Sequence, residues 1–139
     1  MIWCRPCSIS SSPGANPTKP YVDYAQLFKT LYIIELFDTY LPQQTGLKIL
    51  EIGGAPGQFL AYLAKEFGYS AHAIDYSSIG CDKTLEAFEG VNLDLTIWNR
   101  DIFCDISDLP LFDIVFSMGF IEHFNDLDAI VGKHVELLK

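Results

Sequence analysis

The segment LKILEIGGAPGQF, residues 47–59, decides the fold, because it joins a strand-like run to a helix through a glycine-rich turn. The apolar run at 47–52 has the composition of a buried strand, and the two glycines that follow end it. Pro56 suits the first turn of the next helix, which we expect to continue to Phe67. Small residues in such a turn let a ligand approach the main chain, and the helix N-terminus offers free N–H groups and a partial positive charge.

The segments around this turn alternate between helical and strand-like patterns. We expect an amphipathic helix over Tyr21–Leu41, closed by Pro42. Further strands are expected at Ser70–Asp75, Asp94–Trp98 and Phe112–Met118, and further helices at Lys83–Phe88 and Asp126–Lys139. The apolar face of the last helix is expected to be Leu127, Ile130, Val131, His134 and Leu138. The alternation predicts an α/β fold, with a Rossmann-like, mostly parallel sheet and flanking helices.

The same patterns predict the domain organisation. Residues 1–20 are rich in Pro and Ser, and we expect them to form a flexible leader before a domain at 21–139. The chain stops on a helix that a further strand would ordinarily follow. We therefore expect the N-terminal part of a larger domain, truncated after the fourth strand and its following helix.

Composition and charge narrow the class of protein. Half of the 139 residues are hydrophobic, and 10 Phe, 7 Tyr and 2 Trp supply a core, which excludes a disordered tail. The formal net charge of −9 makes nucleic acid and anionic lipid surfaces poor partners. No uncharged apolar run approaches the roughly 20 residues that cross a bilayer, and the N-terminus lacks an apolar signal region. We therefore expect a cytoplasmic protein without a membrane span.

The cysteines give little indication of a metal. Cys4 and Cys7 form a C-x-x-C motif, which suits zinc or redox chemistry. A zinc site usually needs four ligands, and neither a second such motif nor a spaced His pair follows. We favour incidental thiols in a Ser/Pro-rich stretch and predict no metal. Cys81 and Cys104 are expected to be buried small residues.

Acidic residues follow the predicted strands. Asp75 ends the second strand and Asp101 follows the third. A carboxylate at the end of the second strand can accept both hydroxyls of a ribose, or it can cap the next loop or helix, and the sequence leaves both possibilities open. Because the carboxyl ends of parallel strands share one edge of a sheet, we expect these acids to converge there with the glycine turn.

Four segments together resemble the class I S-adenosylmethionine-dependent methyltransferases, the broad group that includes the ubiquinone-biosynthesis methyltransferases. They are LKILEIGGAPGQF, HAIDYS, NRDIFCDISDLPLFDIVFSMG and FIEHFND, in the family's order between Leu47 and Lys139. The resemblance implies that 21–139 is the N-terminal part of a methyltransferase domain. It also implies S-adenosyl-L-methionine as the cofactor. The sequence does not identify the acceptor: we expect a small molecule, and another kind of acceptor stays open.

The resemblance further implies a role for each matching residue. The turn that holds the methionine part would be Glu51, Gly53, Gly54, Ala55 and Gly57. Asp75 falls on the acid that binds the ribose, and Tyr76 on the neighbour that packs against the adenine. Asp101, with Ile102 beside it, falls on the acid that reads the adenine amino group, and Ser117 and Met118 fall near the reactive methyl. Ala55 departs from the pattern, because it replaces the middle glycine.

The charges favour this cofactor over a dinucleotide. A sulfonium and an ammonium attract nearby acids, whereas a pyrophosphate prefers bare N–H groups with no carboxylate close by. Glu51 directly precedes the turn, and a Gly-x-Gly-x-x-Gly pattern starting at Gly53 would fall on Ala55 and Gln58. An NAD-type oxidoreductase half-domain and a non-catalytic nucleotide-binding module stay open as alternatives.

The Glu122–His123 pair after the fourth strand is a candidate for acceptor chemistry. In the family an acid–His pair often faces the acceptor, which implies that His123 acts as a general base, since its ordinary pKa lies near physiological pH. The alternative, that the pair only shapes the loop and the next helix start, stays open. Some resembling RNA 2′-O-methyltransferases bind a metal through such a pair and an earlier acid, but that earlier position is Gly119 here.

Overall fold

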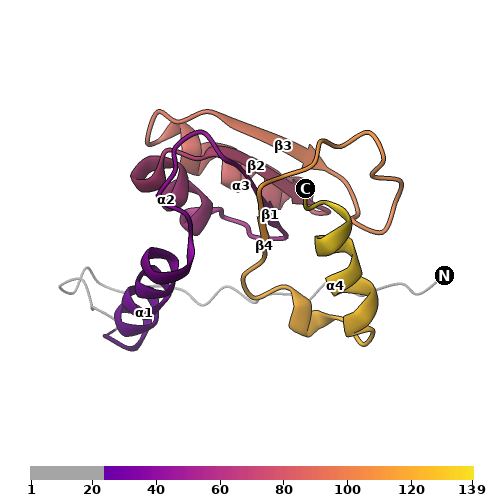
Figure 1. Cartoon of the computed structure of the whole chain (residues 1–139), viewed down its shortest axis with the longest axis horizontal. Helices are drawn as coiled ribbons and strands as arrows, with labels where there is room; N and C mark the ends of the chain where they lie inside the picture. Colours follow the sequence, from indigo (N-terminus) through magenta and orange to yellow (C-terminus); the bar gives the residue numbers. More distant parts are fainter. Residues whose placement is uncertain (1–23) are drawn as a thin grey trace, which may run out of the picture. The chain divides into compact units, whose positions relative to one another are not determined.

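The computed structural model describes residues 24–139, with side chains from residue 29 onward (Figure 1). The predicted leader at 1–20, the Cys4 and Cys7 motif and the expected helical residues 21–23 lie outside the described residues. The chain divides after Leu41 into two compact units. Within the described residues, no helix is both long and apolar enough to cross a membrane.

Helix α1, Tyr24–Tyr40, belongs to the first unit and confirms the helix predicted there. The Leu41 N–H donates to the Phe37 carbonyl at 2.9 Å, which closes the last turn. Pro42 follows directly, and a proline cannot continue the helical hydrogen-bond pattern.

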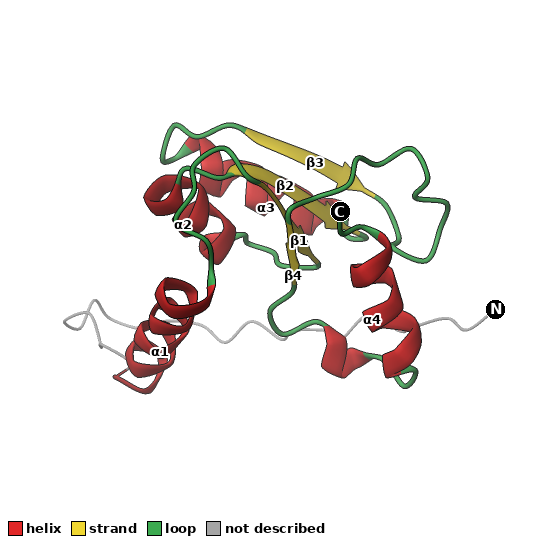
Figure 2. Ribbon diagram, in the orientation of Figure 1, coloured by secondary structure: helices red, strands yellow, loops and turns green. Residues whose placement is uncertain are grey.

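The second unit is built on a parallel sheet of four strands in the order β3-β2-β1-β4 (Figure 2). The strands are β1 Lys48–Ile52, β2 Ser70–Asp75, β3 Leu95–Asn99 and β4 Ile114–Phe116. Glu51 of β1 lies opposite Ala73 of β2 on one side and Phe116 of β4 on the other. The order of strands therefore reverses between β1 and β4. Open α/β sheets bind ligands at such a switch point, outside the carboxyl ends of the strands. The predicted Rossmann-like parallel fold is confirmed.

Helices cover both faces of this sheet. Helices α2, Gln58–Phe67, and α3, Ser78–Glu89, lie on one face, and α4, Leu127–Glu136, lies on the other (Figures 1 and 2). Successive strand side chains point to opposite faces, so Leu50 and Ile52 both pack toward α4 in a cluster that includes Ile130. This packing fixes the ends of β1 and β4 relative to each other.

Several element boundaries differ from the prediction, each for a local reason. Helix α3 begins at Ser78 rather than Lys83, because the Ser77 hydroxyl accepts a hydrogen bond from the Gly80 N–H at 3.1 Å and caps the helix. Pro56 lies in the turn rather than in the first helical turn, since α2 begins only at Gln58.

Strand β4 is shorter than the predicted Phe112–Met118. Phe112 makes an isolated bridge with Leu138, and its N–H donates to the Leu137 carbonyl at 2.9 Å. Phe112 therefore pairs with the residues that follow α4. Because Leu137 and Leu138 take part in this pairing, α4 ends at Glu136 instead of Lys139.

The predicted apolar face of α4 is only partly correct. Ile130 is fully buried, but Leu127 and Val131 are about half exposed, at 53 % and 48 %. Leu137, just past the end of α4, is buried as well, and His134 between them is half-buried, so the covered side follows the i, i+4, i+7 spacing of Ile130, His134 and Leu137. The cysteine prediction fails in the same way at one position: Cys81 is buried, but Cys104 is exposed on a loop.

Candidate functional site

The glycine turn after β1 is compact because its glycines adopt shapes that other residues avoid. Gly53 and Gly57 have left-handed φ angles of 64° and 72°. The Gly53 N–H donates to the Ile74 carbonyl at 2.9 Å, and the Gly57 N–H donates to the Gly54 carbonyl at 2.7 Å. A Cβ at Gly57 would lie 2.5 Å from the Thr84 methyl of α3, so the start of α2 is held close to α3. The turn therefore presents main chain, with little side chain, at the end of β1.

Glu51 lies directly beneath this turn. Its side chain is 2 % exposed, and a Cβ at Gly54 would overlap its carboxyl group. Its Oε2 has no hydrogen-bond partner within the described part of the chain. Burial, and then the negative charge of Asp75, raise the pKa of Glu51 to about 8. Glu51 of β1 and Asp75 of β2 are thus close enough to interact electrostatically, and the buried Glu51 is protonated at neutral pH.

Asp75 ends β2 and lies over the start of α3. Its Oδ1 accepts the Ser77 N–H at 2.8 Å, and a Cβ at Gly80 would lie 2.9 Å from its Oδ2. Asp75 therefore does cap the loop, as one of the two sequence interpretations holds. A carboxylate has further acceptor capacity, so this contact is compatible with ligand binding. The neighbouring Tyr76 side chain is 81 % exposed.

The loop after β3 places Asp101 on the same edge. The Arg100 N–H donates to the Asp75 carbonyl at 3.0 Å, which ties this loop to the end of β2. The Asp101 Oδ1 accepts the Phe103 N–H at 2.9 Å. The Ile102 side chain, 4 % exposed, belongs to the core, so only its main chain is presented to a ligand.

Ser117 lies one residue beyond β4, and its side chain is engaged by α4. The Ser117 Oγ lies 3.1 Å from the His134 Nε2, and the His134 Nδ1 lies 2.8 Å from the Ile130 carbonyl oxygen. A carbonyl only accepts, so Nδ1 carries the proton and Nε2 accepts from the Ser117 hydroxyl. The sequence placed His134 on an apolar face and missed this pair. Met118, next along the chain, is half-buried.

His123 and Glu122 lie in the short 3-10 helix η1, Ile121–His123, and both are exposed. The Glu122 Oε1 is 3.7 Å from the position that a Cβ would take at Gly119. Asp126 caps α4 by accepting the Ala129 N–H at 3.0 Å. In the part of the chain with described side chains, no group of three His, Cys, Asp or Glu residues is arranged to hold a metal.

Sequence reasoning also missed an aromatic row at this edge, made of Phe103, Phe124 and Phe120. The Phe120 and Phe124 ring centroids are 4.9 Å apart, and those of Phe124 and Phe103 are 5.6 Å apart. A Cβ at Gly53 would overlap the Phe120 ring. The signal in the sequence is a phenylalanine that follows each of two strand ends by only four residues, at 103 and 120.

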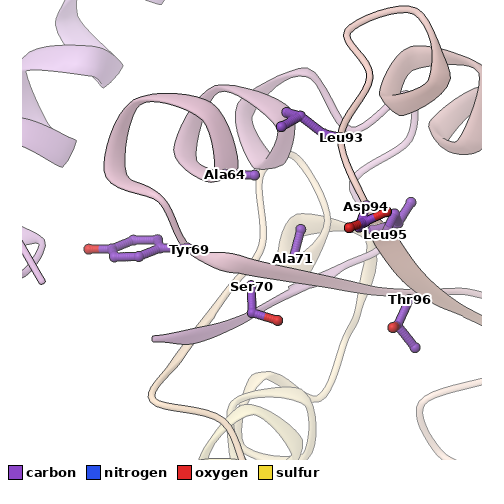
Figure 3. Close-up of a pocket in the computed structure, with 8 residues that line it drawn as sticks. All are labelled: Ala64, Tyr69, Ser70, Ala71, Leu93, Asp94, Leu95 and Thr96. Atoms are coloured by element: carbon purple, nitrogen blue, oxygen red, sulfur yellow. The ribbon is translucent and has the colours of Figure 1, made fainter. Parts of the chain in front are cut away.

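The structure thus gathers the predicted residues along one edge of the sheet. The turn after β1, Asp75 after β2, Asp101 after β3 and Ser117 after β4 all follow carboxyl ends of strands. A cavity of about 340 Å³ lies at the other edge, where β2 and β3 begin (Figure 3). It is lined by Ala64, Tyr69, Ser70, Ala71, Leu93, Asp94, Leu95 and Thr96. This cavity is therefore separate from the candidate site.

Comparison with known proteins bears on the family. Residues 49–139 match the model of a methyltransferase domain. The ubiquinone biosynthesis O-methyltransferase of Chelativorans sp. (strain BNC1) is 32 % identical over 96 residues, which are 68 % of this chain and 37 % of that protein.

Solved structures share the fold. A protein of Galdieria sulphuraria assigned as a sarcosine dimethylglycine methyltransferase superposes with a TM-score of 0.71 at 17 % identity, over 84 % of this chain and 44 % of that one. Phosphoethanolamine N-methyltransferase 2 of Haemonchus contortus, solved with phosphomonomethylethanolamine and S-adenosylhomocysteine, gives 0.66 at 30 % identity, over 81 % and 26 %. The chain spans less than half the length of each of these three relatives. The match over 49–139 and the four motifs agree: the chain belongs to the methyltransferase-domain family, of the class I S-adenosylmethionine-dependent type.

Proposed function

We propose that this domain binds S-adenosylmethionine at the carboxyl edge of the sheet and transfers its methyl group to a small-molecule acceptor. The observation that carries the proposal is the buried Glu51 carboxyl beneath the glycine turn, in the field of Asp75. Two neighbouring acids, one of them with an unpartnered oxygen in the described residues, favour a ligand that carries positive charge. A pyrophosphate at this turn would face the negative charge of Asp75 and would keep Glu51 in its neutral form, whereas a cation would favour the ionised Glu51, which counts against a dinucleotide.

Each strand end contributes to the proposed cofactor site. The residues assigned to it are Glu51, Gly53, Gly54, Ala55, Gly57, Asp75, Tyr76, Asp101, Ile102, Ser117 and Met118. The exposed Tyr76 ring is free of the core and suits packing against an adenine. For Ile102 and Ser117 the main chain is the part that we assign to the ligand, because the core holds one side chain and His134 holds the other.

The bound cofactor would supply a methyl group on a sulfonium, which is already an excellent leaving group. What the chain must add is alignment of the acceptor with that methyl group, since in-line positioning supplies most of the reduction in barrier. The exposed His123 on η1 is assigned as the base for an acceptor that must lose a proton. Unchanged turnover after His123→Ala would remove that role.

The relatives support a small molecule as the acceptor. They include an O-methyltransferase of ubiquinone biosynthesis and an N-methyltransferase solved with phosphomonomethylethanolamine. The net charge of −9 is unfavourable for a nucleic acid acceptor. We also propose a cytoplasmic location, because the thiols of Cys81 and Cys104 are free, as is usual in a reducing compartment. Cell fractionation tests that location.

Calorimetry with the full chain tests the cofactor. We expect S-adenosylmethionine and S-adenosylhomocysteine to bind more tightly than NAD, and the opposite order would reject the proposal. Asp75→Asn should weaken binding of S-adenosylmethionine by about tenfold, because it removes a charged acceptor from the site. Asp94→Asn is the matched control: Asp94 lies at the other edge of the sheet, beside the cavity there, and its loss should leave the affinity unchanged.

A further inference from the structure

The Phe120 side chain packs against the glycine turn, and the roles assigned to the motif residues do not include it. A Cβ at Gly53 would overlap ring atoms Cδ2 and Cε2 of Phe120, so the ring lies directly against the main chain of that residue. Gly53 also carries a left-handed φ of 64°. Glycine is thus needed at position 53 for two reasons: the turn needs its left-handed backbone, and the Phe120 ring leaves no room for a Cβ.

The ring is held in place by its neighbours. Phe124 meets it nearly edge to face, with an interplanar angle of 62°, and Phe103 extends the row at 55° to Phe124. Phe120 and Phe124 also pack against the core cluster that includes Ile52 and Ile130. A ring fixed on two sides has little freedom left to lose when a ligand binds beside it.

The acids and the ring flank the same short turn. Glu51 is buried against Gly54, and Phe120 packs against the adjacent Gly53. A cation that is drawn to the acids at this turn therefore comes close to an aromatic ring. The face of such a ring attracts positive charge, and the attraction is strongest where water is excluded.

We propose that Phe120 forms an aromatic wall of the cofactor site and contacts the sulfonium, so that the site distinguishes charged S-adenosylmethionine from its neutral demethylated product. This inference rests on the proposed function. In the transfer, the acceptor lone pair forms a bond to the methyl carbon, the sulfur–methyl bond breaks, and its electron pair stays on sulfur. The sulfur loses its positive charge, and with it the attraction of the ring. Phe120 would then favour exchange of product for fresh cofactor without accelerating the chemical step itself.

The test compares two ligands on one set of variants. Phe120→Leu keeps an apolar side chain and removes the aromatic face. We expect the Kd of S-adenosylmethionine to rise about threefold to tenfold, while the Kd of S-adenosylhomocysteine changes less than twofold. Phe120→Tyr retains the ring and should keep the wild-type ratio of the two constants. Phe124→Leu is the matched control, because Phe124 lies one ring further from Gly53 and its loss should shift both constants alike.

The outcomes separate this proposal from the one it rests on. Equal weakening of both ligands by Phe120→Leu, no weakening, or a selective loss that Phe120→Tyr shares would overturn the role of the ring. A wild-type chain that binds neither ligand would overturn the cofactor site as a whole. Thermal unfolding checks that the variants fold; if Phe120→Leu does not, Phe120→Met replaces it with a flexible apolar chain of similar length, and the same ratio decides.

Discussion

One acid at each edge of the sheet can be compared, and the surroundings of the two acids are opposite. At the amino edge, Asp113 accepts the Lys48 N–H at 2.8 Å and pairs with the Lys139 ammonium at 2.7 Å, and the Lys139 contact chiefly lowers its pKa. At the carboxyl edge, Glu51 is buried with an unpartnered oxygen among the described residues, and its pKa rises to about 8. Glu51 lies on β1, and Asp113 directly precedes β4, the strand that pairs with β1. The amino edge satisfies its acid and gains stability, whereas the carboxyl edge keeps an unfavourable one, as ligand sites do.

The glycines of the two edges differ in the same way. Gly46 precedes β1 and Gly53 follows it, and both have left-handed φ angles, of 79° and 64°. A Cβ at Gly46 would meet nothing within 4 Å, whereas a Cβ at Gly53 would overlap the Phe120 ring. The turn at the amino edge needs glycine for its backbone shape alone. The turn at the carboxyl edge needs it for shape and for close packing as well.

The largest expected effect comes from replacing the glycines of the two turns by alanine. Gly53→Ala should lower the free energy of unfolding by about 2–5 kcal/mol, because backbone strain adds to overpacking against Phe120. Gly46→Ala should cost only the strain, about 1–2 kcal/mol. Urea unfolding of the two variants measures both. Equal losses would show that the crowding at Gly53 relaxes without cost, and the two turns would then be equivalent.

The second prediction compares the two acids through pH. Between pH 6.5 and 8 the unfolded chain has Glu51 ionised, since its ordinary pKa is 4.5, whereas the folded chain retains the proton up to about pH 8. The folded state binds the extra proton, so its stability must fall as pH rises, by about 1.4 kcal/mol per unit and about 2 kcal/mol over this window. Urea unfolding at several pH values should show the slope, and Glu51→Gln should remove it.

The window and the control isolate Glu51 from the other groups. Burial lowers the pKa of His72 and raises that of Cys81, so His72 contributes mainly at the acid end of the window and Cys81 mainly at its alkaline end. Asp113 has a lowered pKa, so its contribution is present above its unfolded value and is lost only in acid. Asp113→Asn should therefore keep the wild-type slope between pH 6.5 and 8. A slope that persists in Glu51→Gln would place the titrating group elsewhere.

The parts of the fold that local chemistry determines could be predicted from the sequence. The run at 47–52 is apolar and bounded by glycines, and α2 ends at Phe67 as expected, directly before Gly68 with its left-handed φ of 69°. The start of α3 was missed. Its cap is Ser77, but Asp75 and Ser78 on either side are also residues that commonly cap helices, so the sequence alone does not single out Ser77. Strand ends that share an edge follow from the parallel order itself, which is why the sequence could place the candidate site residues on one edge of the sheet.

The rest depends on contacts between distant residues. The position of Glu51 follows from the motif, but its burial and raised pKa depend on Gly54 and Asp75 around it. Phe120 meets Gly53 only after β4 has paired with β1, and no periodicity in the sequence indicates that meeting. Val131 shows the same limit in another way. It was expected on the buried face of α4 but is 48 % exposed, because apolar spacing along a helix does not say which residues a neighbouring element will cover.

A third prediction concerns cofactor binding and rests on the proposed function. A cation at the turn stabilises the ionised form of Glu51, so binding at pH 7 should release up to one proton. The affinity for S-adenosylmethionine should then rise by up to about tenfold from pH 6.5 to 7.5. Calorimetry in buffers of different ionisation enthalpy counts the proton, and Glu51→Gln should release none. Equal proton counts in the two proteins would contradict a role for Glu51.

The smallest effect concerns Ser117, a carboxyl-edge side chain whose partner, His134, is supplied by α4. His134→Leu removes the acceptor, and Ser117→Ala removes the donor, so each should lower the free energy of unfolding by about 1 kcal/mol. The double variant should cost less than the sum of the two, with a coupling of about 1 kcal/mol in urea unfolding, because either change alone already breaks the same bond. Additive losses would mean that the two side chains do not depend on each other. The Ser117 hydroxyl would then resemble the Glu51 Oε2, which has no partner among the described residues, and not the paired Asp113 carboxylate.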